Sequence, residues 1–248
     1  VGNASGGRAS VAKADYAYQP FERVRFSDKG DGTYVNPIIN ADFPDPDVIR
    51  VGDTFYMLST TFHQLPGATL LKSHDLVNWE YCANPLQQLV TDPTDAKWNK
   101  YNLLNGEDAY AEGMWASALA YHDGTYYILI SSLDLGGAVL TATDPAGPWT
   151  YRKLNDNFYD CGMLFEDDCI YVVCGINSIH VVKLDKNFNR LADKEVINRA
   201  NSGLEGSKIY HIGDYYYIYN TYGGTEGSQT IFRSKDPMGT YEEVAARV

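Results

Sequence analysis

Four residues of this sequence share one position, since each lies eleven residues before a tyrosine in a short aromatic segment. They are Asp45, Trp115, Asp160 and Glu205. Carboxylates gathered at one place can chelate a hard cation such as calcium. They can also serve as the general acid and general base at a glycosidic bond, with a third carboxylate tuning the other two. Alternatively, each acid is only a turn-forming residue with no chemical role. That interpretation suits a single acid, but it explains less well why three acids occur at the same position of the repeat.

The element that must bring these residues together is a repeat of four strands. The segments 52–60, 122–131, 166–175 and 212–220 each contain a short turn followed by an aromatic strand, and a further strand, a turn and a last strand follow each of them. Units of four strands that repeat every ~40–50 residues are typical of a β-propeller. The sequence therefore predicts an all-β fold in which four antiparallel, four-stranded blades are recognisable.

The propeller also predicts where the four residues lie. Equivalent positions of successive blades have the same radius and height. A residue eleven positions before the second strand of a blade falls near the start of the innermost strand, close to the central axis. We therefore expect the three carboxylates and the tryptophan to surround one central mouth.

Charge and composition limit the partners. The 20 Lys and Arg residues against 32 Asp and Glu residues give a formal net charge of −12. Neither nucleic acid nor a membrane surface is expected as a partner, because both require basic patches, and no apolar stretch reaches the ~18 residues that span a bilayer. The 20 tyrosines offer flat rings that suit sugars, and an acidic protein suits an uncharged polysaccharide.

The composition and residue pattern of the chain predict an N-terminal arm and a propeller domain. Residues 1–35 are polar and poor in strand signals, which predicts an N-terminal arm, whereas residues 36–248 carry the strand-and-turn pattern of the propeller. Within the second part, residues 83–112 are polar and are interpreted as a long insertion. The cysteines fit no zinc pattern and are expected to be small buried side chains; they lie at positions 82, 161, 169 and 174.

Short motifs at the start of each repeat resemble glycoside hydrolase family 43, over about residues 36–248. Those of the first repeat are Asn36-Pro37-Ile38-Ile39, Phe43-Pro44-Asp45-Pro46-Asp47-Val48-Ile49-Arg50, Leu65-Pro66-Gly67 and Ser73-His74-Asp75-Leu76-Val77-Asn78-Trp79. Those of the later repeats are Trp115-Ala116, Tyr159-Asp160 and Leu204-Glu205-Gly206-Ser207. Each motif is short, but their combination is specific.

The resemblance implies a five-bladed propeller that cleaves arabinose- or xylose-containing polymers with inversion at the anomeric carbon. It implies that Asp45 is the general base, that Glu205 is the general acid, and that Asp160 orients the acid and modulates its pKa. Inversion needs room for a water molecule, which implies about 6.5–9.5 Å between the carboxyl groups of base and acid.

The sequence departs from the family pattern at three positions. Asp47 stands where the family usually has Ser, which makes Asp47 a second candidate for the base, with Asp45 preferred. Ser117 and Cys161 stand where Pro is usual. We expect Cys161 to change local stiffness rather than chemistry.

Three further residues are candidates for contact with the sugar. Trp115 shares the central position. Phe62 follows the second strand of blade one, where the family often places a ring against the sugar, and packing is the equal alternative. His63 is a candidate partner for a sugar hydroxyl, with an ordinary exposed loop histidine as the alternative.

The sequence therefore predicts a secreted or periplasmic glycosidase, its signal peptide removed, with α-L-arabinofuranosidase or β-xylosidase activity on a plant cell-wall polysaccharide or oligosaccharide. An endo-acting arabinanase, a non-catalytic sugar-binding propeller and a calcium-centred structural propeller are the alternatives. No metal ligand is assigned and no cofactor is required, while a structural calcium ion stays an open alternative.

The resemblance implies one more blade than the sequence offers. The blade starts at 45, 115, 160 and 205 place the next near 250, whereas the chain has 248 residues. We expect the last blade to come from a further C-terminal segment or from a partner chain, and we expect these residues alone to be weakly active or inactive.

Overall fold

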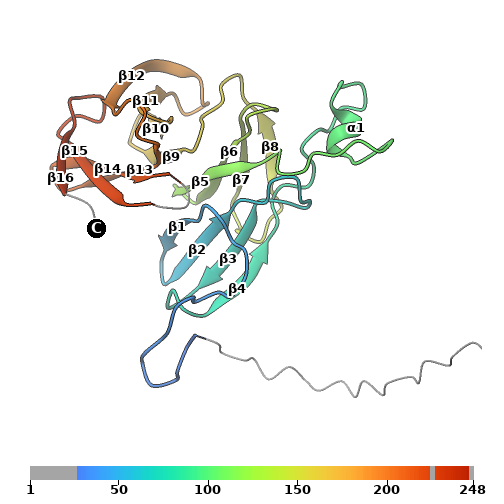
Figure 1. Ribbon diagram of the computed structural model, residues 1–248, viewed down its shortest axis with the longest axis horizontal. Helices are drawn as coiled ribbons and strands as arrows, with labels where there is room; N and C mark the ends of the chain where they lie inside the picture. Colours follow the sequence, from blue (N-terminus) through green and yellow to red (C-terminus); the bar gives the residue numbers. More distant parts are fainter. Residues whose placement is uncertain (1–26, 224–226, 246–248) are drawn as a thin grey trace, which may run out of the picture.

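The computed structural model describes residues 27–223 and 227–245 and contains four antiparallel sheets of four strands each (Figure 1). The strands are β1 (Asp47–Val51), β2 (Thr54–Ser59), β3 (Thr69–Ser73), β4 (Trp79–Ala83), β5 (Trp115–His122), β6 (Thr125–Ser131), β7 (Ala138–Ala142), β8 (Thr150–Lys153), β9 (Gly162–Phe165), β10 (Ile170–Cys174), β11 (Ser178–Leu184), β12 (Arg190–Asn198), β13 (Leu204–Ile212), β14 (Tyr215–Tyr222), β15 (Gln229–Ser234) and β16 (Glu242–Ala245). The predicted all-β propeller fold with four recognisable blades is confirmed.

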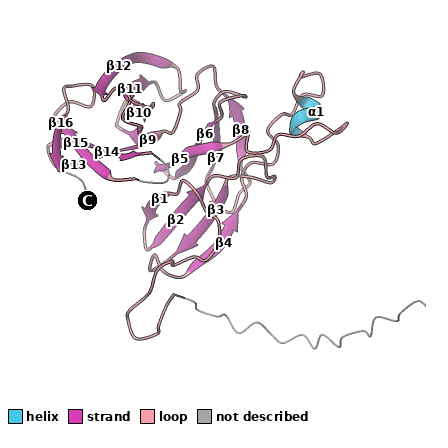
Figure 2. Cartoon of the chain, in the orientation of Figure 1, coloured by secondary structure: helices cyan, strands magenta, loops and turns pink. Residues whose placement is uncertain are grey.

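Each blade is a meander, with its strands in sequence order and the first strand innermost (Figures 1 and 2). Two-residue turns join the first two strands of three blades, and each such turn has a glycine with positive φ, Gly52 at 60°, Gly124 at 79° and Gly213 at 61°. Type I′ and type II′ hairpin turns require a positive φ at one or both central residues, which glycine adopts without strain. The turn-and-aromatic pattern of the sequence therefore marks real hairpins.

The core lies between neighbouring blades rather than inside any one of them. One cluster packs β2 and β3 of blade one against β5 to β7 of blade two, with Leu58, Leu70 and Ile128 fully buried. A second cluster joins blades two and three, and a third joins blades three and four, where Ile218 and Phe232 are buried. Blade-to-blade packing thus fixes the innermost strands relative to one another.

The flank of blade four that faces away from blade three is aromatic. Cross-strand pairs place Tyr210, Tyr217, Tyr219, Ile212 and Ile231 on this flank. Tyr210 is 43% exposed and Ile212 is 56% exposed. An exposed apolar sheet face of this kind is characteristic of a surface that another element covers; we call it the blade-four flank.

Two predicted segments have further structure. The described end of the predicted arm, residues 27–35, is tied to blade one because the Asn78 amide donates to Asp28 Oδ2 at 2.9 Å; residues 1–26 lie outside the described part. The predicted insertion 83–112 begins with the last residue of β4 and carries the short helix α1 (Trp98–Tyr101), which lies at the edge of the molecule in Figure 1. Within the described residues, α1 included, no helix has the length and apolar character needed to cross a bilayer.

Candidate active site

The four residues at the predicted central position all lie at the starts of innermost strands. Asp45 and Asp160 each precede an innermost strand by two residues, Trp115 is the first residue of β5, and Glu205 is the second residue of β13. All four blades therefore contribute one of these residues at the same end of the central axis, which we call the mouth.

Two features of the backbone, positive φ angles and β-bulges, orient these side chains. Asp45 and Asp160 have positive φ angles of 51° and 49°, a conformation that a non-glycine residue adopts at a cost and that clusters at functional sites. In blades two and four the register shifts instead between Trp115 and Ala118 and between Glu205 and Lys208. Such bulges redirect a side chain at the end of a strand.

The bulge of blade four depends on Gly206. Its φ is 67°, and a Cβ there would lie 2.7 Å from Thr221 Oγ1. The neighbouring Ser207 hydroxyl accepts a hydrogen bond from the Asn220 amide at 2.5 Å, which ties the bulge to β14. A side chain at position 206 would therefore clash with Thr221 and strain the bulge that carries Glu205.

Hydrogen bonds link the third and fourth blades at the mouth. The Gly206 amide donates to Asp160 Oδ2 at 2.6 Å, and the Tyr159 hydroxyl donates to Glu205 Oε2 at 3.0 Å. The sequence places Tyr159 in the motif of the third repeat but predicts no role for it. The one feature of the sequence that could have indicated a role for Tyr159 is its position beside Asp160. The contact of Tyr159 with Glu205 joins two blades and cannot be read from the local sequence.

The three carboxylates also interact electrostatically. Burial raises the pKa of Asp160, and the charges of Glu205 and Asp45 raise it further, while Lys208 and the Gly206 amide act in the opposite direction. Each carboxylate thus lies close enough to affect the protonation of Asp160, so the structure brings the three predicted residues together.

The pKa of the Tyr159 phenol is affected by the same carboxylate charges. Burial, the charge of Glu205 and its hydrogen bond to Glu205, followed by the charges of Asp160 and Asp45, raise the pKa of Tyr159 to about 12. The phenol therefore stays protonated at neutral pH and is able to donate to Glu205 there.

The two candidate bases lie in different surroundings. Asp45 is exposed at the mouth, and the preceding Pro44 carbonyl is fixed by the Ser59 hydroxyl at 2.8 Å. Asp47 is buried, and its Oδ2 accepts a hydrogen bond from the Leu119 amide at 2.8 Å and lies 3.3 Å from Lys208 Nζ. A general base must reach a water molecule beside the substrate, and Asp45 has the freer carboxylate.

The three candidate sugar contacts form part of an aromatic rim. The rings of Phe62 and Trp115 meet edge to face with centroids 5.8 Å apart. His63 Nδ1 accepts a hydrogen bond from the Ala111 amide at 3.1 Å, and its ring lies 5.3 Å from that of Tyr110. Phe62 and His63 are both half-buried. The rim thus connects the mouth to the insertion.

The insertion is anchored to blade two. Lys97 Nζ lies 2.5 Å from Asp134 Oδ1, and the Tyr101 hydroxyl donates to Asp134 Oδ2 at 2.7 Å. Hydrogen bonds from these partners, that of Lys97 first, lower the pKa of Asp134 to about 2. The insertion is therefore held against the loop between β6 and β7.

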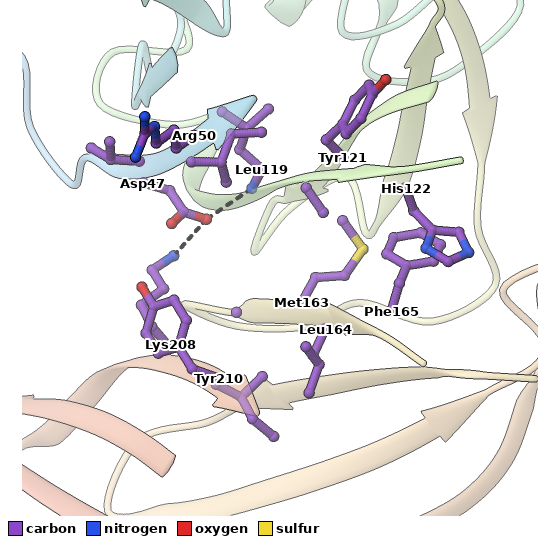
Figure 3. A pocket seen from close by; sticks show the side chains of 15 residues that line it. Asp47, Arg50, Leu119, Tyr121, His122, Met163, Leu164, Phe165, Lys208 and Tyr210 are labelled. Atoms are coloured by element: carbon purple, nitrogen blue, oxygen red, sulfur yellow. Dashed lines mark hydrogen bonds and ion pairs between the residues drawn. The ribbon is translucent and has the colours of Figure 1, made fainter. Parts of the chain in front are cut away.

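A hollow of about 250 Å³ lies below the mouth and is lined by the innermost strands of all four blades (Figure 3). Its polar groups include Asp47, Lys208 and Tyr210, but none of the three carboxylates of the mouth. Among the residues that the structure describes, no three His, Cys, Asp or Glu side chains are arranged to hold a metal ion.

The fold and the mouth define a class: a β-propeller that presents three coupled carboxylates and an aromatic rim at one end of its axis. The sequence model described as glycosyl hydrolases family 43 matches residues 34–247. The chain belongs to this family, which confirms the resemblance seen in the motifs.

Individual proteins agree with this assignment. The chain is 36% identical over 224 residues to a non-reducing end α-L-arabinofuranosidase of Bacteroides ovatus, with 85% of this chain and 40% of the relative covered. It is 30% identical over 251 residues to a β-xylosidase of Formosa agariphila, covering 88% of this chain and 41% of the relative. A solved structure, a bifunctional GH43-CE protein of Bacteroides eggerthii, superposes with a TM-score of 0.75 at 30% identity, covering 84% of this chain and 28% of the other. The chain thus spans about two fifths of the curated relatives' length.

Proposed function

We propose that the protein is an inverting glycoside hydrolase that releases arabinose or xylose from plant cell-wall polysaccharide. The observation that supports this most is the meeting of Asp45, Asp160 and Glu205 at one mouth from equivalent positions of three blades. Two relatives carry the names α-L-arabinofuranosidase and β-xylosidase, which supports these two sugars.

In the proposed reaction each carboxylate has its own task. Asp45 takes a proton from a water molecule that attacks the anomeric carbon, and Glu205 gives a proton to the departing oxygen. Asp160 and Tyr159 hold blade four in place through Gly206 and Glu205. Phe62, Trp115 and His63 provide the surface for the sugar.

The test is hydrolysis of aryl α-L-arabinofuranosides and aryl β-xylosides by the purified protein, followed by NMR. The first-formed sugar should have the inverted anomeric configuration, and a retained product would contradict the assignment. Sugar binding without hydrolysis would identify a non-catalytic propeller, and new reducing ends within arabinan would identify an endo-acting enzyme.

Secretion and independence from cofactors belong to the same proposal. The substrate is a polymer outside the cell, and both proton-transfer groups are side chains of the protein. Cell fractionation should find the protein outside the cytoplasm, and EDTA should leave turnover unchanged. A fall in melting temperature with EDTA would instead identify a structural calcium ion.

We also propose that a further segment of the protein covers the blade-four flank. The exposed tyrosines of this flank, and relatives more than twice as long as the matched region, support this. Mass spectrometry and the elution volume of the native protein test it, with a partner chain as the other outcome. A monomer of these 248 residues with full activity would refute it.

A further inference from the structure

Lys208 of blade four reaches the innermost strands of the other three blades. Its Nζ lies 3.3 Å from Asp47 Oδ2 in blade one, 3.5 Å from the Ser117 carbonyl in blade two and 2.8 Å from the Cys161 carbonyl in blade three. An ammonium group has three N–H donors, and each other blade supplies one acceptor. The Lys208 side chain is 19% exposed and that of Asp47 is 8% exposed.

Figure 3 shows this contact from close by, with the Lys208 side chain directed at Asp47 and the Asp47 carboxylate also bonded to the amide of Leu119. We call Lys208 and its three partners Asp47, Ser117 and Cys161 the axial clasp. The clasp therefore joins blades one and four, between which no hydrophobic cluster is found among the described residues.

Every member of the axial clasp follows a mouth residue closely in the chain. The pairs are Asp45 and Asp47, Trp115 and Ser117, Asp160 and Cys161, and Glu205 and Lys208. One to three residues of backbone thus connect each clasp residue to a residue of the mouth. A displacement of the clasp should therefore reach the carboxylates, because so few residues lie between them and the surrounding core is closely packed.

The charge of the lysine persists in this environment. Burial opposes the ammonium form, but the neighbouring Asp47, Cys161 and Asp160 outweigh burial and raise the pKa of Lys208. The phenol of Tyr210 also faces this charge. A buried ion pair contributes little net stability compared with apolar side chains of similar size, so stability alone does not account for a buried lysine at this place.

We infer that Lys208 is a positioning residue, whose contacts with Asp47, Ser117 and Cys161 fix the spacing of the three carboxylates at the mouth. The inference rests on the proposed function, since the spacing serves the transfer of two protons. Lys208 touches no substrate in this role and acts through the segments that connect Asp45 and Asp160 to their strands. Its charge also favours the ionised form of Asp160.

The test compares Lys208→Met with Lys194→Met in the native full-length protein. Lys194 also joins two blades, because its Nζ donates to the Met238 carbonyl at 2.6 Å, but it lies on the outer strand β12. Misplacement of reacting groups by about 1 Å can cost 10²-fold in rate, so Lys208→Met should lower kcat by about this factor with little change in KM. The control variant should keep the wild-type kcat.

Two further readouts separate positioning from stability. The pH profile of kcat should change in Lys208→Met, because Asp160 loses a nearby cation and its pKa rises. Carbon-13 NMR of the Asp160 carboxyl group should show the same upward shift, and this measurement does not depend on activity. If the wild-type protein hydrolyses no glycoside, the proposed function fails while the NMR titration still tests the clasp.

A lower melting temperature with unchanged kcat, KM and pH profile would overturn the inference and leave a structural tie. Should Lys208→Met fail to fold, Asp47→Asn replaces it, because the amide oxygen still accepts from Leu119 while the ion pair is lost. Asp47→Asn should then lower kcat in the same direction, and a wild-type kcat for this variant would also overturn the inference.

Discussion

The hydrogen bond from Tyr159 to Glu205 allows a quantitative test of the proposed acid. Tyr159→Phe removes one oxygen atom and leaves the ring in place. Glu205 becomes charged as it gives its proton to the leaving group. Hydrogen bonds to charged groups contribute about 1.5–3 kcal/mol, and the O···O distance of 3.0 Å is at the long end for a hydroxyl donor. We therefore take the lower value, about 1.5 kcal/mol, which corresponds to a roughly tenfold loss in kcat/KM.

The loss should depend on the leaving group. A natural sugar alcohol needs the proton of a well-placed Glu205, whereas dinitrophenolate departs without it. The assay is kcat/KM of Tyr159→Phe for an oligosaccharide and for a dinitrophenyl glycoside, with Tyr151→Phe on the outer strand β8 as the matched control. Equal losses on the two substrates, or losses that add to those of Glu205→Gln in the double variant, would refute the reasoning.

Four other changes test the site and the packing. Glu205→Ala should lower turnover of natural linkages by about 10²–10⁴-fold and of dinitrophenyl glycosides much less; equal losses in a kinetic comparison would remove Glu205 from the acid role. Asp45→Asn should abolish hydrolysis but keep sugar binding in calorimetry, because a base acts on water rather than on the bound sugar. Asp160 has a raised pKa when folded, so the stability it gives is present at acidic pH and is lost as the pH rises through that pKa. Asp160→Asn should therefore raise the melting temperature near neutral pH more than at acidic pH, and the reverse order in calorimetric scans would contradict this. Gly162→Ala should destabilise the fold by about 1–3 kcal/mol through overpacking, as urea unfolding can measure, because its Cβ would lie 2.7 Å from the Ser207 carbonyl oxygen.

The repeat made the fold and the position of the mouth predictable from sequence. The offset of eleven residues identifies the mouth residues even though the tyrosines from which it is counted pair differently with the innermost strand. Tyr171 pairs with Leu164, seven residues earlier, whereas Tyr216 pairs with His211, five residues earlier. The bulge after Glu205 adds one residue to the inner strand of blade four and so makes up one of these two residues. Hairpin spacing is visible in a sequence, but the bulge is not.

Contacts between blades were beyond the reach of the sequence. The partners of Lys208 lie 47 to 161 positions away in the chain, and no local pattern connects them. A signal was present at one of the three partners only. Asp47 departs from the family pattern and contacts Lys208 through its side chain, whereas Ser117 and Cys161 contribute backbone carbonyls, which any residue supplies.

The acids of the mouth can be compared with acids that only form turns. Asp75, Asp92 and Asp185 accept hydrogen bonds from residues two to four positions ahead, and these bonds lower the pKa of each. Asp160 instead accepts its hydrogen bond from Gly206 in the next blade, and its pKa is raised because burial outweighs that bond. A turn requires no carboxylate that is buried and bonded across blades. The burial of the Asp160 carboxylate, with its bond to the next blade, is therefore not accounted for by the turn in which Asp160 stands and supports the proposed task of Asp160 at the mouth.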